Sequence, residues 1–134
     1  MPAASAPGAI FTKGCLALVA GAGLAGAAGV ALAAVAAHKI DSPSLATAAF
    51  MLMIHAAALV AIAALAALLP NRGFVPVGTL MLAAVCLFSG DVALHATTGQ
   101  HIFPFAAPTG GSLTIISWIL VAGCAAAAIL RFPR

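Results

Sequence analysis

Four long apolar stretches are the feature of this chain that most constrains its fold. They cover residues of about 14–37, 44–69, 75–98 and 111–130, and Asp91 is the only charged residue inside them. Crossing the hydrocarbon core of a bilayer takes roughly 20 consecutive apolar residues in a helix, so each stretch is long enough. Because lipid offers backbone groups no hydrogen-bond partners, such a segment crosses it as a helix. The sequence therefore predicts an all-α integral membrane protein, a four-helix bundle with up-down-up-down topology.

The composition excludes a water-soluble globule of this size. Apolar residues make up 65% and charged residues 5% of the 134 residues, whereas a small soluble domain buries only about two-thirds of its unfolded surface. Four spans also leave little of the chain for a soluble catalytic domain. We find no carboxylate pair, no nucleophile beside a base and no phosphate-binding loop, so we predict that the protein is not an enzyme. Cys15, Cys86 and Cys124 lie in apolar runs without paired spacing, so no metal site is predicted.

Serine, proline and glycine residues mark the ends of the predicted helices. Ser42 is a candidate N-cap for the second stretch, with Pro43 at the first helical position. The run from Pro70 to Gly73 is a turn sequence, and Gly99 is the expected end of the third stretch. These turns make consecutive helices antiparallel neighbours.

The segments outside the four stretches are short. Residues 1–13 are predicted to form an N-terminal tail. The connection 99–110 contains Ile102, Phe103 and Phe105, which makes it too apolar for a wet loop, and it is too short to span. We predict an apolar interfacial loop that lies across one end of the bundle.

The few charged residues set the predicted orientation. With four spans both termini share one side of the membrane, and that side has four bases: Lys13, Arg72, Arg131 and Arg134. The other side has Lys39, with Asp41 close by. The positive-inside rule therefore predicts that both termini are cytoplasmic. These isolated bases do not form the concentrated stripe that nucleic-acid binding needs, so no nucleic acid is expected as a partner.

A repeat of small residues characterises the first stretch. Helices in lipid associate by close backbone approach at such residues. The members of this small-residue face recur every four positions: Gly21, Ala25, Gly29, Ala33 and Ala37. We interpret it as a helix-packing face for a neighbouring helix or for a second subunit. The alternative is that an alanine-rich composition produces the repeat by chance.

Ionisable residues inside a span are costly, and by default they indicate a functional hypothesis. The candidate intramembrane polar cluster has five members: His38, His55, Ser89, Asp91 and His95. Asp91 and His95 lie four positions apart on one helix face, so they are expected to form a hydrogen-bonded or ionic pair. The alternative is a protonated Asp91 that donates a hydrogen bond to a backbone carbonyl. His55 lies deep in the second stretch, and we expect it to bond to a polar group of the first or third stretch, such as Ser89 or the backbone near Gly90.

Four interpretations of the polar cluster remain open at this point. The first is a set of interhelical hydrogen bonds that fixes the register of the bundle. The second is passage of protons or a small solute along Asp91, His95 and His55. The third is haem or metal ligation by two of His38, His55 and His95, although no motif specifies haem. The fourth is binding of an unspecified partner. We predict no cofactor, with haem as the alternative.

Several short motifs occur in the order found in one protein family. They include Ala37-His38, His55-Ala56-Ala57-Ala58-Leu59, Phe88-Ser89-Gly90 and Pro108-Thr109-Gly110-Gly111, followed by Trp118. With them the chain resembles the small membrane proteins of domain of unknown function 423, the YgdD and YwdK type, which are related to transmembrane protein 256. The resemblance extends over residues of about 21–125.

This resemblance implies a four-helix membrane protein of bacterial inner membranes or mitochondria, with no established biochemical activity. The family's membrane histidine corresponds to His55, and its histidine at the end of the first helix corresponds to His38. Family members usually have Tyr-Gln where this chain has Met51-Leu52, and Ser or Thr where it has Asp91. These departures suggest a rearranged polar network that is specific to this protein.

Together these observations predict a small non-enzymatic protein of the bacterial inner (cytoplasmic) membrane. We expect it to lie in the lipid bilayer as an accessory or stabilising subunit, packed against a larger membrane complex or against copies of itself. The first alternative is an element that conducts protons or a small solute through Asp91, His95 and His55. The second alternative is a haem-binding membrane subunit.

Overall fold

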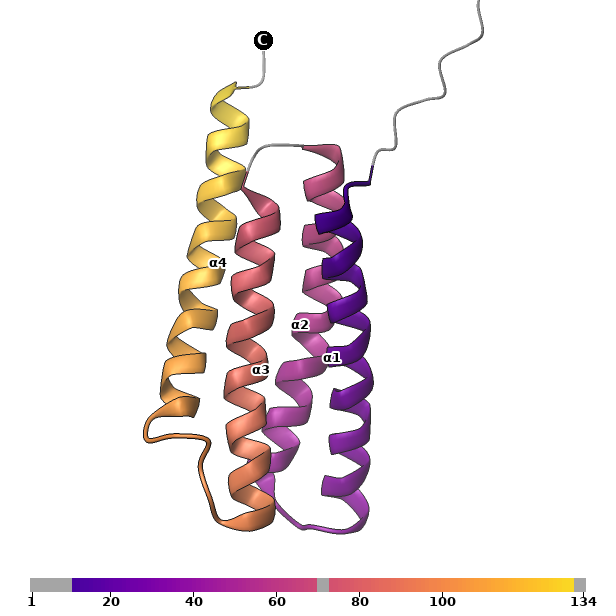
Figure 1. Ribbon diagram of the computed structural model, residues 1–134, viewed down its shortest axis with the longest axis vertical. Coiled ribbons are helices and arrows are strands. Elements are labelled where there is room, and N and C mark those ends of the chain that lie inside the picture. The colour runs from indigo at the N-terminus through magenta and orange to yellow at the C-terminus, as the bar shows by residue number, and fades with distance from the viewer. Residues whose placement is uncertain (1–10, 70–72, 132–134) are drawn as a thin grey trace, which may run out of the picture.

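The computed structural model describes residues 11–69 and 73–131 of the chain (Figure 1). They form four helices, which are α1 (Lys13–His38), α2 (Pro43–Leu68), α3 (Phe74–Thr98) and α4 (Ala106–Arg131), and they include no strand. Each helix is long and apolar enough to cross a membrane. The prediction of an all-α membrane protein with four helices of spanning length is confirmed. Most of the predicted tail, residues 1–10, and residues 70–72 of the predicted turn lie outside the described residues.

Side-chain caps mark the starts of α1 and α2, and left-handed glycines mark both ends of α3. Ser42 Oγ accepts the N–H of Leu45 at 3.3 Å at the start of α2, as the sequence predicted. Thr12 Oγ1 caps α1 in the same way. Gly73 and Gly99 flank α3 with φ angles of 81° and 75°, a conformation that glycine adopts without steric strain.

The start of α4 differs from the prediction. The sequence placed it near Gly111, but α4 begins at Ala106, so the connection after α3 comprises residues 99–105 and not 99–110. The N–H of Thr109 already bonds to the carbonyl of Phe105 at 2.9 Å. Pro108 was interpreted as part of the loop, yet it lies in the first turn of α4, where a missing N–H removes no helical hydrogen bond.

The four helices do not contribute equally to the bundle. Helices α1, α2 and α3 all contact one another, whereas α4 lies along α3 alone (Figure 1). Helix α4 is also the one least buried by the rest of the chain. The architecture is therefore a three-helix core with a fourth helix attached to one side.

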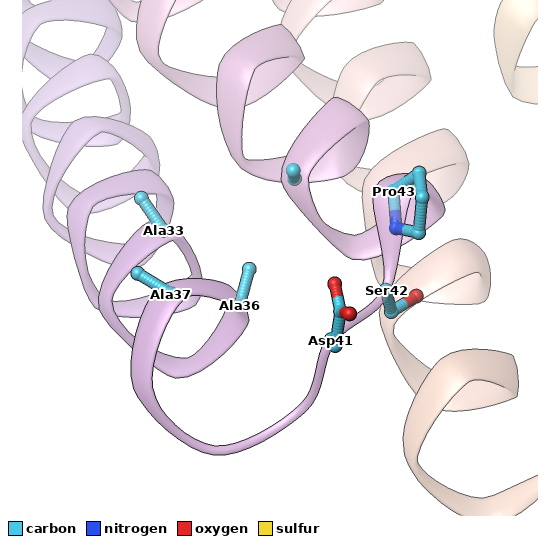
Figure 2. A pocket seen from close by; sticks show the side chains of 7 residues that line it. Ala33, Ala36, Ala37, Asp41, Ser42 and Pro43 are labelled. Carbon is cyan, nitrogen blue, oxygen red and sulfur yellow. The ribbon is translucent and has the colours of Figure 1, made fainter.

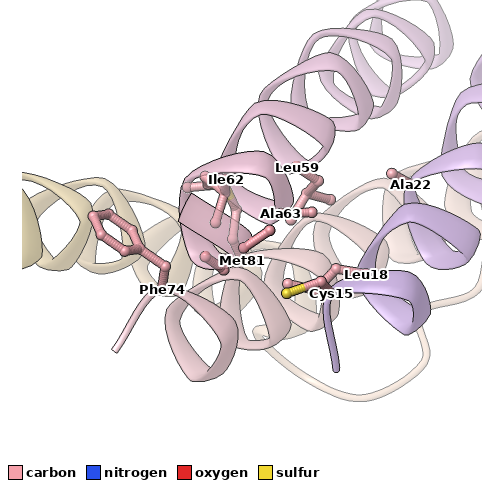
Figure 3. Close-up of a cluster of buried hydrophobic side chains, with 10 residues drawn as sticks. Cys15, Leu18, Ala22, Leu59, Ile62, Ala63, Phe74 and Met81 are labelled. Atoms are coloured by element: carbon pink, nitrogen blue, oxygen red, sulfur yellow. The ribbon is translucent and has the colours of Figure 1, made fainter. Parts of the chain in front are cut away.

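Small and large apolar side chains pack together in the three-helix core. Figure 3 shows a cluster that joins α1, α2 and α3, including Cys15, Leu18, Ala22, Leu59, Ile62, Ala63, Phe74 and Met81. A second cluster comprises Ala25, Leu52, Ala56 and Val85. Because lipid removes most of the hydrophobic drive between helices, such close van der Waals packing has to hold them together.

The small-residue face of α1 is used inside the chain over its first three members. A Cβ added to Gly29 would lie 2.7 Å from Met53 Cγ and 3.0 Å from the Ala49 carbonyl oxygen, so α1 and α2 touch at backbone distance there. Gly21 lies under the side chain of Leu82 from α3, and Ala25 is buried. Neighbouring helices of the same chain therefore cover this part of the face.

The last two members of the face lie where α1 and α2 diverge. Ala33 is half-buried and Ala37 is exposed. Both line a hollow of about 250 Å³ next to Asp41 and Pro43, at the connection between the two helices (Figure 2). The close packing of α1 on α2 thus ends before the helices do.

Candidate functional site

Asp91 is the centre of the most elaborate polar arrangement in the described residues. Its side chain lies on α3, is 1% exposed, and receives three N–H groups from the chain that follows. Oδ1 accepts the backbone N–H of Ile102 at 2.7 Å. Oδ2 accepts the backbone N–H of Ala107 at 3.3 Å and lies 2.9 Å from His101 Nδ1. We refer to Asp91 with these three partners as the Asp91 clamp.

The geometry of the Asp91 clamp fits an ionised carboxylate. The two backbone N–H groups can only donate, so each carboxylate oxygen has to accept. Ala107 lies in the first turn of α4, where helix N–H groups have no helical partner and where the helix dipole favours a negative charge. The clamp therefore fastens both the 99–105 connection and the N-terminus of α4 to α3.

The predicted pair of Asp91 with His95 does not form. Asp91 bonds to His101 instead, and the His95 ring stacks on the His101 ring with centroids 4.2 Å apart and planes 9° apart. The prediction was wrong because it considered α3 alone. The connection folds back along α3, so its own N–H groups and His101 reach the carboxylate. A polar His101 directly before the apolar run 102–105 was the signal that the sequence offered.

His55 on α2 also has partners that the sequence did not predict. The ring is 3% exposed. Its Nδ1 lies 2.8 Å from the carbonyl oxygen of Met51, one helical turn earlier. Trp118 Nε1 of α4 donates to its Nε2 at 3.2 Å, and the two rings are tilted at 58°. The expected bond to Ser89 or to the backbone near Gly90 is absent.

These contacts fix the tautomer of His55. The indole N–H of Trp118 can only donate, so Nε2 of His55 accepts and Nδ1 carries the proton that is donated to Met51. Both ring nitrogens of a neutral imidazole are then satisfied. Metal or haem ligation by His55 would require the Trp118 hydrogen bond to break, and the described residues contain no group of three side chains suited to hold a metal ion.

Ser89 differs from the other buried hydroxyls of the helices. Thr114 and Ser117 donate to the carbonyl oxygens of Gly110 and Leu113, one turn earlier, at 2.9 Å and 2.8 Å. Ser89 is fully buried, and its Oγ has no hydrogen-bond partner among the described residues. A buried hydroxyl without a partner is unfavourable, so its surroundings are of interest.

The candidate polar cluster therefore separates into distinct parts. Asp91 and His95 belong with His101 near the end of α3, whereas His55 pairs with Trp118 between α2 and α4. His38 is exposed at the end of α1. No hydrogen bond between described residues connects the Asp91 clamp to His55.

Comparison with known protein families gives one finding. The family model described as "Protein of unknown function (DUF423)" matches residues 32–111. The matched segment contains His38, His55 and all members of the Asp91 clamp. Among curated proteins none matches the chain, and no solved structure does.

Proposed function

The chain belongs to the DUF423 family of proteins of unknown function, and from that premise we propose that it is an accessory subunit that packs against a larger membrane complex. In this role it is not an enzyme, and it stabilises its partner through apolar helix contacts within the bilayer. The proposal places it in the bacterial inner membrane, with both termini in the cytoplasm.

The peripheral position of α4 is the observation that carries this proposal. A helix that lies along α3 alone presents most of its circumference to the membrane. Large apolar side chains cover that surface: Ile115, Ile116, Ile119, Leu120, Ile129 and Leu130. A partner helix can replace lipid there without exposing any polar group, because lipid and aliphatic side chains are similarly apolar.

The polar groups support a structural role for the protein. Asp91 and His55 are both buried, and hydrogen bonds within the chain satisfy both. A buried acid or base that serves catalysis or conduction has to exchange a proton. It therefore needs a hydrogen-bonding position left open for the group that supplies or accepts that proton. The bonded states of Asp91 and His55 favour the fixing of helix positions over the alternative of proton conduction.

The charges of the described residues support the proposed orientation. Lys13 and Arg131 lie at the end of the bundle where α1 begins and α4 ends, and Lys39 with Asp41 lies at the opposite end (Figure 1). The remaining bases used for the prediction, Arg72 and Arg134, lie outside the described residues. An excess of bases at the terminal end indicates the cytoplasmic side.

Photo-crosslinking in native membranes tests the proposal. We place a benzophenone-bearing amino acid at position 119, on the outer face of α4, and at position 27, on the lipid-facing side of α1, as the matched control. An accessory subunit gives an adduct with a different protein at position 119 and a weaker one or none at position 27. Adducts only between copies of this chain, or a clean monomer after purification in mild detergent, would contradict the proposal.

A further inference from the structure

One partner in the Asp91 clamp can change its charge near neutral pH. Ile102 and Ala107 contribute backbone N–H groups, which stay neutral. The third partner is the imidazole of His101, whose Nδ1 lies 2.9 Å from Asp91 Oδ2. Imidazole is the side-chain group that ordinarily gains or loses a proton between about pH 5 and pH 8. The strength of the clamp can therefore depend on the charge of a single side chain.

The two ring nitrogens of His101 lie in different surroundings. Nδ1 faces the buried carboxylate of Asp91, whereas the His101 side chain as a whole is 50% exposed. Within the described residues no hydrogen bond uses Nε2 of His101. A proton can bind to Nε2 and leave the bond to Asp91 in place, since both nitrogens of an imidazolium donate. His55 differs, because both of its ring nitrogens are already bonded.

His101 lies near the boundary between the hydrocarbon core and the headgroups. Helix α3 has 25 residues, which makes it about 37 Å long, whereas the hydrocarbon core is about 30 Å thick. His95 is exposed in the last turn of α3, and the His101 ring stacks on it with centroids 4.2 Å apart. Both rings therefore lie at a depth that water reaches.

A charge on His101 strengthens the clamp. It turns a neutral hydrogen bond into a charge-assisted one, which is roughly twice as strong, and salt screens a partly buried pair only weakly. When the 99–105 connection opens, His101 moves away from Asp91 and this gain is lost. The closed clamp thus holds the added proton more firmly than the open one, so by linkage acid favours the closed state.

The stack of His95 on His101 admits one charge more readily than two. The ring planes are only 9° apart, and two charged rings at this separation repel each other. A neutral His95 ring can stay stacked on a charged His101 ring. The charged state of the clamp therefore has one proton on His101, and His95 leaves the stack if it is protonated as well.

No other titratable side chain of the described residues shares in these contacts. Asp91 and His95 of α3 are the ones that face His101. The connection between α1 and α2 lies at the same end of the bundle (Figure 1). Its titratable side chains form no hydrogen bond or ion pair with the clamp, and they are His38, Lys39 and Asp41. Those of α4 lie toward its other end, and they are Cys124 and Arg131.

We propose that His101 makes the Asp91 clamp a pH-sensitive latch, which holds the 99–105 connection and the start of α4 more firmly when His101 is charged. The latch is tightest in mild acid and looser at alkaline pH. Because α4 carries the surface assigned to the partner, the latch links the pH at this end of the bundle to the position of that helix. This last consequence rests on the proposed function, whereas the experiment below uses the purified chain alone.

Amide hydrogen exchange tests the latch. The chain in lipid nanodiscs is exchanged from about pH 8 to about pH 5.5, the range in which imidazoles change charge. Each rate is divided by the chemical exchange rate at that pH, which gives a protection factor. The reporter is the N–H of Ile102, bonded to Asp91. The N–H of Leu45, bonded to Ser42 at the same end of the bundle, is the reference. We expect protection of Ile102 relative to Leu45 to rise by about two- to fivefold in mild acid.

Two variants assign this rise to His101. His101→Asn keeps an uncharged N–H group near the position of Nδ1, so protection of Ile102 should no longer depend on pH. His95→Phe keeps a stacked ring that cannot be charged, so the rise should remain. In the unaltered chain the nitrogen-15 signals of His101 should titrate over the same pH range as the protection.

Three results would overturn the proposal. The first is constant protection of Ile102 over the whole pH range in the unaltered chain. The second is a rise that His101→Asn retains or that His95→Phe abolishes. The third does not need either variant to fold, and it is a rise whose midpoint differs from that of the His101 signals.

Discussion

Helices α1 and α4 are held to the rest of the protein in different ways. Helix α1 touches both α2 and α3, and its contacts are small apolar residues such as Ala22, Ala25 and Gly29. Helix α4 packs its backbone against α3 alone, at a close approach around Gly110. The Asp91 clamp fastens its N-terminus, and Trp118 donates a hydrogen bond to His55 of α2. In lipid, close packing and hydrogen bonds replace the hydrophobic drive. The comparison shows that α4, whose backbone approaches one helix, is fastened by hydrogen bonds to α3 and α2, whereas α1 is held by close apolar packing against two helices.

The largest effect is expected from Gly110→Leu. A Cβ at this position would lie 2.5 Å from the backbone nitrogen of Phe88 and 2.8 Å from the carbonyl oxygen of Ala84. Because the obstacle is backbone, α4 has to move away from α3, and we expect the free energy of unfolding to fall by about 3 kcal/mol or more. Gly123→Leu is the matched control, since nothing lies within 4 Å of a Cβ there. Unfolding in mixed detergent micelles measures both, and equal effects would refute the close approach.

The second effect concerns the Asp91 clamp. Asp91→Ala removes the acceptor for Ile102, Ala107 and His101, so the 99–105 connection should detach from α3. We expect chymotrypsin to cleave after Phe105 at least about tenfold faster, because local opening controls cleavage; Phe103 precedes Pro104 and is not a chymotrypsin site. His95→Ala is the control, since His95 only stacks on His101. If both variants are cleaved at the same rate, the clamp does not hold the connection.

The third effect is on the packing of α1. Gly29→Ala introduces a Cβ that has to displace Met53 and lies 3.0 Å from a carbonyl oxygen of α2. We expect a loss of about 1 kcal/mol in the free energy of unfolding, since the Met53 side chain can partly adjust. Gly23→Ala, on the open side of the same helix, should be neutral or slightly stabilising. If Gly29→Ala leaves the free energy of unfolding unchanged, α1 and α2 are packed less closely at Gly29 than these distances indicate.

The smallest effect is expected from Trp118→Phe. This change removes the indole donor to His55 Nε2 and keeps an aromatic ring. Hydrogen bonds between membrane helices contribute about 0.6 kcal/mol on average, and we expect a destabilisation of that size. His55 ring signals in nitrogen-15 NMR should report the loss, because Nε2 is the acceptor. An unchanged Nε2 signal would contradict the hydrogen bond from Trp118 to His55.

The sequence predicted the fold well because one physical constraint dominates it. Four apolar stretches of spanning length have few alternatives to four helices. Ser42 and Gly99 cap their helices at the positions that their residue types predicted. The start of α4 was missed because Pro108 and Gly110 are typical of loops. Here Pro108 lies in a first turn, and Gly110 is needed for contact with the backbone of α3.

The polar partners could not be predicted from spacing along single helices. Asp91 and His95 share a helix face, but a carboxylate takes the strongest donors within reach, and the returning loop supplied them. His55 found Trp118, which is 63 residues away in the sequence. Contacts of this kind depend on how helices are placed relative to one another, which local pattern does not determine.

Labelling with a membrane-impermeant thiol reagent tests most directly whether lipid surrounds these four helices. Single cysteines replace Thr12, Lys39 and Gln100 in a background in which Cys15, Cys86 and Cys124 are changed to alanine. Four spans predict that positions 39 and 100 react from one side of the membrane and position 12 only from the other. Reaction of all three positions from the same side, or release of the protein from membranes by alkaline carbonate, would contradict a four-span membrane protein.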